Sequence, residues 1–141
     1  PLRCVPLFDR LQIVMNDAAH LLYNLPRRAH AKPLLQELHW LPVRERAKFK
    51  GLCIAHKTRY GSVPDYIKDR LVSYTPRTTL RSSDALLLNG PKWKKSTVGG
   101  RFFSVLVPQM WNGLPIMLRK ESSYLRFRKL LMAKLFKQSF E

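Results

Sequence analysis

Prolines divide this chain into short segments and restrict where its helices can begin and end. Ten prolines occur in 141 residues. Proline fits the first turn of a helix, where its missing N–H would be unpaired anyway, but it stops a helix that runs into it. Apolar residues recur at three- and four-residue steps over 9–25, which predicts a helix, and Pro26 ends it. Two further prolines open short predicted helices over 33–38 and 64–72.

The segment 42–60 is the most informative of the predicted helices. Gly61 ends it, because glycine tolerates the left-handed conformation that often closes a helix. Its apolar residues form two separate stripes, Phe49, Leu52, Cys53, His56 and Tyr60 on one and Val43, Ala47 and Ile54 on the other. Two basic stripes run between them, Arg44, Lys48 and Arg59 on one side and Arg46, Lys50 and Lys57 on the other. This pattern favours a helix packed between neighbours, with its cations at the seams.

The segment 77–89 loses the helical period. Two threonines favour extended backbone, and an apolar run over 85–88 is bounded by turn residues. We therefore expect one or two strands over 77–89, a turn through the polar stretch that follows Gly90, and a second strand over 101–106. The sequence predicts a small β-hairpin here.

A last helix is predicted over 122–138. Ser122 or Ser123 can cap its start, because a serine hydroxyl accepts from the free N–H groups of the first turn. The expected fold is α+β and mainly α, with about five helices and a small hairpin. We treat residues 1–141 as one module, in which a helical region over residues 1–75 is followed by a hairpin region over residues 77–106 and by the final helix.

The charge of the chain points to a polyanionic partner. There are 26 Lys and Arg against 9 Asp and Glu, which gives a formal net charge of +17. Such a surplus attracts nucleic acid, because each neutralised phosphate releases counterions. A basic composition can also only maintain solubility, or dock a chain on acidic protein or anionic lipid. These alternatives stay open at this stage.

Membrane and secretion signals are absent from the sequence. No stretch approaches the roughly 18 apolar residues of a membrane span, and the start lacks the apolar core of a signal peptide. We therefore expect an intracellular segment that does not enter a membrane. The first residue is Pro1 rather than Met, which suggests a piece of a longer chain.

Catalytic and metal-binding patterns are also missing. The two cysteines have no paired spacing, and the four histidines lack the helical pair of a zinc protease. No Ser, His and acid series comes with a strained elbow, and no glycine-rich phosphate loop is present. We expect no catalytic residue, no metal site and no cofactor.

Candidate nucleic-acid contacts lie in two groups besides the helix at 42–60. A cluster of Lys92, Trp93, Lys94 and Lys95 would combine cations for phosphates with an indole that can stack on a base. Trp93 can equally fold back onto the core. Arg77, Arg81 and Arg101 could form a guanidinium row on one face of the hairpin, although Arg81 can also pair with Asp84.

Three other aromatic or histidine side chains are expected to pack in the core. His39 and Trp40 end an apolar run, which favours burial over ligand binding. Trp111 precedes Asn112, which can cap or turn the chain while the indole fills the interior.

Short motifs follow one another in a fixed order from His39 to the last predicted helix. They are His39-Trp40-Leu41-Pro42-Val43 with Arg46, Phe49 and Lys50; Gly61, Pro64 and Tyr66; Leu80 to Ser83; Gly99, Arg101, Phe103 and Ser104; Pro108, Trp111, Asn112, Leu114 and Pro115; and Ser123, Phe127, Leu135 and Phe136. In this order they closely resemble the region beyond the thumb in the reverse transcriptase of non-LTR, LINE-type retrotransposon polyproteins. The resemblance covers nearly the whole chain.

The resemblance implies a role at the non-catalytic end of an RNA-directed DNA polymerase, in the nucleus. The parent would nick DNA, prime on the nick and copy its own RNA into the target. Such polymerases need adjacent aspartates to hold divalent metals, whereas every aspartate here is isolated. The implied partners are RNA or DNA and the upstream polymerase domain of the same polyprotein.

The resulting hypothesis is an electrostatic clamp on template RNA or on the RNA–DNA product. We expect its contacts at Arg44, Arg46, Lys48, Lys50, Lys92, Lys94, Lys95 and Arg101, with limited sequence preference. One alternative is an interaction scaffold that docks on the polymerase core or on a host protein. Another is an inactive retroelement fragment. The sequence does not determine the oligomeric state.

Overall fold

The computed structural model describes residues 5–61, 63–75, 86–90 and 103–141. Within these residues the chain forms seven helices and no strand, which confirms the mainly helical prediction. The helices are α1 (Val5–Leu22), α2 (Ala31–Glu37), α3 (Val43–Tyr60), α4 (Asp65–Lys68), α5 (Phe103–Asn112), α6 (Ile116–Arg119) and α7 (Tyr124–Phe140). The first four and α7 occupy segments that were predicted to be helical.

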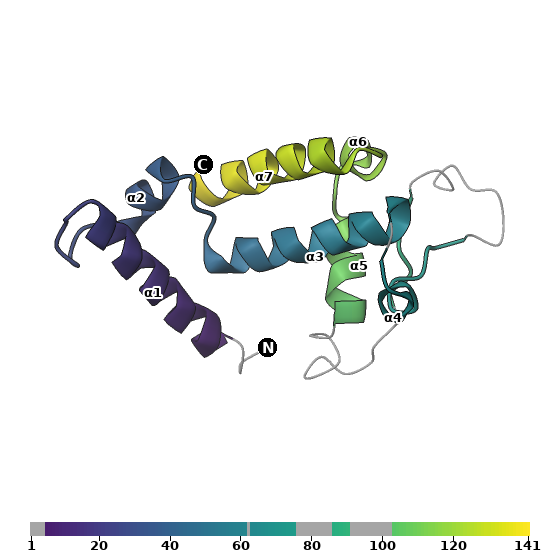
Figure 1. Cartoon of the computed structure of the whole chain (residues 1–141), viewed down its shortest axis with the longest axis horizontal. Coiled ribbons are helices and arrows are strands. Elements are labelled where there is room, and N and C mark those ends of the chain that lie inside the picture. The colour runs from purple at the N-terminus through teal and green to yellow at the C-terminus, as the bar shows by residue number, and fades with distance from the viewer. Residues whose placement is uncertain (1–4, 62, 76–85, 91–102) are drawn as a thin grey trace.

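α3 runs through the middle of the fold and carries the main core (Figure 1). α7 lies beside it and runs in the opposite direction, while α5 packs across it. Trp111 of α5 and Phe127 of α7 are fully buried between the helices, with ring centroids 5.9 Å apart. Gly51 of α3 allows the close approach of α5, because a Cβ there would meet Val107 Cγ2 at 3.3 Å. The prediction that α3 packs between neighbours is confirmed.

A second, smaller cluster joins α1 to α2. It consists of Met15, Ala19, Leu34 and Leu35, and Trp40 packs against it half-buried, as expected. Other apolar side chains of α1 are not covered, because Leu7, Leu11, Val14 and Leu21 are all exposed. α1 is tied to the start of α3 by a polar contact, in which the Val43 N–H donates to Gln12 Oε1 at 2.9 Å.

The predicted hairpin is wrong where the structure describes it. Residues 103–106, expected in the second strand, form the first turns of α5. The expected strand is instead part of a helix that buries Val105, Val107 and Trp111. Tertiary burial here overrides the low helix propensity of valine and of Pro108, which has no N–H for the Ser104 carbonyl. Residues 77–85 and 91–102 lie outside the described residues.

Side chains of α5 hold the segment 86–90 in place of a sheet. Asn112 Nδ2 donates to the Leu88 carbonyl and its Oδ1 accepts from the Leu88 N–H, both at 2.9 Å. Trp111 Nε1 donates to the Leu86 carbonyl at 2.8 Å, and the indole is buried as predicted. In the described residues, regular pairing is limited to one antiparallel bridge between Ser73 and Leu88.

Two helix ends differ in detail from the expectation. Gly61 follows α3 in an extended conformation, with φ −128° and ψ −161°, and not in the left-handed region. Ser123 stands at the N-cap of α7, but its side chain makes no capping hydrogen bond. Its backbone N–H instead donates to Glu121 Oε1 at 3.0 Å. Among the described residues, no helix combines the length and apolar character needed to cross a membrane.

Candidate nucleic-acid interface

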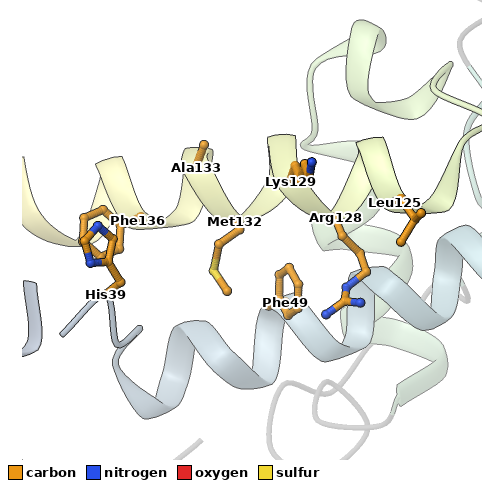
Figure 2. A pocket seen from close by; sticks show the side chains of 8 residues that line it. All are labelled: His39, Phe49, Leu125, Arg128, Lys129, Met132, Ala133 and Phe136. Carbon is orange, nitrogen blue, oxygen red and sulfur yellow. The ribbon is translucent and has the colours of Figure 1, made fainter.

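A groove of about 540 Å³ runs between α3 and α7 (Figure 2). Its apolar lining comes from Phe49, Leu125, Met132, Ala133 and Phe136, and its polar lining from His39, Arg128 and Lys129. No carboxylate of the described residues takes part in this lining. The groove is therefore an apolar channel whose two permanent charges are positive.

Aromatic rings mark both ends of this groove. At one end the ring of His39 stacks on Phe136, with centroids 5.5 Å apart and planes inclined by 16°. At the other end Arg128 points from α7 towards α3 beside Phe49 (Figure 2), with its guanidinium carbon 6.0 Å from the ring centroid. The same guanidinium lies 5.7 Å from the Tyr124 ring. A cation over an aromatic face is attracted by the ring quadrupole, which restrains the guanidinium in this position.

Four cations follow the same seam, and we call Lys50, Lys57, Arg128 and Lys129 the basic seam. Lys57 Nζ lies 4.7 Å from the centroid of the Tyr124 ring, next to Arg128. All four side chains are exposed. Within the portion of the chain that the structure describes, none of them forms an ion pair with a carboxylate.

The buried thiol of Cys53 lies close to three cations of the basic seam. Burial raises the pKa of its thiol. The positive charges of Arg128, Lys57 and Lys50 act in the opposite direction, as does a hydrogen bond with Tyr124. Three cations of the basic seam therefore lie close enough to one buried thiol to affect its ionisation.

His56 anchors the start of α7 to α3. Its side chain is only 1% exposed and stacks on Phe127, with centroids 4.3 Å apart. Nε2 donates to the Glu121 carbonyl at 2.7 Å, which leaves Nδ1 unprotonated in the neutral ring. Burial lowers the pKa of His56, opposed by the hydrogen bond and charge of Glu121. A neighbouring contact, from the Tyr60 hydroxyl to the Arg119 carbonyl at 2.8 Å, fixes the same corner.

The four predicted cations of α3 do not form one surface. Arg44 pairs with Asp9 of α1 at 3.0 Å, and Lys48 pairs with Glu45 at 2.7 Å. Arg46 lines a separate groove beside α1. Lys50 alone of the four belongs to the basic seam.

The remaining predicted contacts lie outside the described residues. They are Arg77, Arg81, Lys92, Trp93, Lys94, Lys95 and Arg101. They remain predictions of the sequence.

Sequence reasoning missed most residues of the groove. Phe49 was assigned to an apolar stripe, and Arg128 and Phe136 belonged to the last helix without a role. His39 was expected in the core, but that prediction is wrong, since its side chain is exposed and stacks on Phe136. His39 has a φ of 54°, a left-handed turn between α2 and α3 that the sequence did not reveal. The i, i+4 pair of Tyr124 and Arg128 was the one available signal.

The donor chemistry of the described residues does not assemble a metal site. No group of three or more His, Cys, Asp or Glu side chains comes together among them. What the groove offers is exposed positive charge next to flat rings. Comparisons with protein-family models, with curated proteins and with solved structures find no match.

Proposed function

We propose that this chain is a non-catalytic nucleic-acid-binding module that grips a sugar–phosphate backbone along the basic seam. The observation that carries the proposal is the gathering of Lys57, Arg128 and Lys129 beside aromatic rings, with Lys50 close to the same buried thiol, Cys53, as Lys57 and Arg128. None of the four has a carboxylate partner among the described residues. Exposed cations without internal partners are available to an external anion. Neutralising phosphates with such cations releases counterions and gives a salt-dependent affinity.

The composition of the whole chain supports the same proposal. A net charge of +17 raises the local concentration of any polyanion around the molecule. In the proposal the predicted cations of 77–101 add to the seam, with Lys92, Trp93, Lys94 and Lys95 as the densest group. Such contacts are to phosphates and bases in general, so sequence preference is limited.

The biological setting of the proposal rests on the ordered motifs. In it, the module lies beyond the thumb of a LINE-type reverse transcriptase and acts in the nucleus. It holds template RNA or the RNA–DNA product while the upstream polymerase domain performs target-primed synthesis. One of those motifs, His39 to Val43, forms the turn that leads into α3 and places His39 at the groove.

The decisive experiment compares two triple charge reversals that change the net charge equally. The first replaces Lys50, Lys57 and Arg128 by Glu. The second replaces Arg27, Lys68 and Lys137, which are exposed and ion-paired away from the seam, by Glu. Affinity for a short labelled RNA is measured by fluorescence anisotropy at several KCl concentrations, with circular dichroism to check folding.

We expect the seam variant to bind RNA much more weakly and to lose about two to three units from the slope of log K against log salt. The matched variant should retain most of the slope. Equal losses in the two variants would show that only bulk charge matters and would contradict the proposed interface.

A scaffold role is the second candidate, and the exposed apolar side chains of α1 favour it. Leu21 is 81% exposed and Val14 66%, on a helix that lies away from the basic seam. In this case the upstream polymerase domain covers α1 and the charge complements an acidic surface. The chain would then bind RNA no better than an unrelated domain of equal net charge.

A further inference from the structure

We infer that the groove between α3 and α7 takes unpaired bases, so that the ligand of this module is a single strand. The inference rests on the proposed function and adds the kind of nucleic acid that the site selects. Phosphate contacts alone do not select a single strand, because a duplex displays the same phosphate groups at higher density. The apolar surface of the groove makes the distinction.

The lining of the groove matches the two chemical halves of a nucleotide. Phe49, Met132 and Phe136 offer apolar and aromatic surface between the helices (Figure 2). Arg128 and Lys129 stand among them as the charged lining residues. Bases stack on aromatic rings and on guanidinium planes, while the phosphates that join them contact the cations.

The two aromatic ends are spaced for a short run of bases. Arg128 and Phe136 are eight residues apart on α7, which corresponds to about 12 Å along a helix. One nucleic-acid strand advances about 3.4 Å per stacked nucleotide, so the groove spans about three or four nucleotides. The near-parallel rings of His39 and Phe136 provide a flat platform at one end.

A duplex cannot use this platform. Its bases are stacked on one another and paired, so only its outer backbone and groove edges reach a protein. A volume of about 540 Å³ between two helices admits a few bases but no double helix. An acidic amphipathic peptide would also meet cations and apolar surface, but it would not need flat rings facing the groove.

The test separates base stacking from phosphate contact. The variants are Phe136→Ala, which removes the ring, and Phe136→Trp, which keeps an aromatic face. Leu130→Ala is the matched control, since Leu130 is a 45% exposed residue of the same helix that does not line the groove. The probes are labelled oligouridine, the DNA oligothymidine of equal length, an abasic strand of equal length and a blunt RNA duplex.

We expect the wild-type chain to bind oligouridine more tightly than the abasic strand or the duplex. Phe136→Ala should weaken binding of the single strand about tenfold and leave duplex binding nearly unchanged. Phe136→Trp and Leu130→Ala should bind like the wild type. Comparing oligouridine with oligothymidine shows whether the strand is RNA or DNA.

Two results would overturn the inference and leave the proposed function standing. One is equal affinity for the single strand, the abasic strand and the duplex. The other is a Phe136→Ala variant that binds oligouridine as tightly as the wild type does but no longer binds a Glu-rich amphipathic peptide that the wild type binds. If no nucleic acid binds at all, or if binding ignores salt, the proposed function itself fails.

Discussion

The guanidinium of Arg128 is held over the ring of Phe49, at 6.0 Å, although the two residues lie 79 positions apart in the chain. The pair joins the outer surfaces of α7 and α3 at the groove. A cation on a flexible side chain loses rotamer freedom when it grips a ligand, and prior restraint reduces that loss. Arg128 is therefore the cation of the seam whose removal should cost most.

We predict that Arg128→Gln weakens RNA binding several-fold and lowers the salt slope by about one unit. The matched control is Arg126→Gln, because Arg126 carries the same charge on the same helix but pairs with Glu121 at 3.2 Å. Its slope should change less. Anisotropy titrations at several salt concentrations measure both. A larger effect for Arg126 would contradict the placement of the interface.

We predict that acid destabilises the protein through His56. The folded pKa of His56 is lowered by burial, so between that value and the unfolded value of 6.5 the native state binds fewer protons than the unfolded chain. This contribution to stability is complete above about pH 6.5 and is lost as the pH falls towards the folded pKa. Urea midpoints recorded from about pH 7 to about pH 5 measure the loss.

Replacement of His56 identifies the source of that pH dependence. His56→Phe keeps a ring against Phe127 and removes the titrating group, so the midpoint should fall less on acidification. His30→Asn is the control, because His30 is exposed. If His56→Phe retains the full pH dependence, another group is responsible.

We predict a large loss of stability for Trp111→Ala, about 3–5 kcal/mol, because the side chain is fully buried in the main core. Trp111→Phe should cost less in packing but leaves the half-buried Leu86 carbonyl without its 2.8 Å donor, at about 1 kcal/mol. Denaturant unfolding followed by circular dichroism measures both. Losses below about 1 kcal/mol for the alanine variant would contradict the central position of this residue.

We predict that Asn112→Ala costs about 1–3 kcal/mol, because the amide satisfies both backbone groups of Leu88. Gln109→Ala is the control on the same helix, where an exposed side chain should contribute within about 0.5 kcal/mol. Thermal and urea unfolding compare the two. Equal midpoints would show that solvent replaces these hydrogen bonds without loss.

Sequence prediction was most accurate for helices whose start and stop residues enclose an uninterrupted helical pattern of apolar residues. For α3, Pro42 and Gly61 flank an uninterrupted helical pattern, and the predicted bounds match the observed helix. For α5, the turn predicted through the polar stretch after Gly90 led us to expect a second strand over 101–106, but residues 103–112 form a helix. The burial of Trp111 decides the outcome there, and burial depends on neighbours that no local window contains.

The candidate site was only partly predictable for the same reason. The stripe that contains Lys50 and Lys57 was visible in the period of α3. Its combination with Arg128 follows from the antiparallel placement of α7 beside α3, which neither helix encodes alone. Arg44 belonged to the other stripe, and Asp9 of α1, distant in sequence, takes up its charge.

The ionisation of the buried Cys53 thiol depends on whether a ligand neutralises the cations around it. Arg128, Lys57 and Lys50 now favour its ionised form against the effect of burial. A polyanion that neutralises these cations removes that support, so the pKa of Cys53 rises further. In a Cys4→Ser background, the pH at which this thiol ionises, followed by the ultraviolet absorbance of the thiolate, would report strand binding without any attached dye.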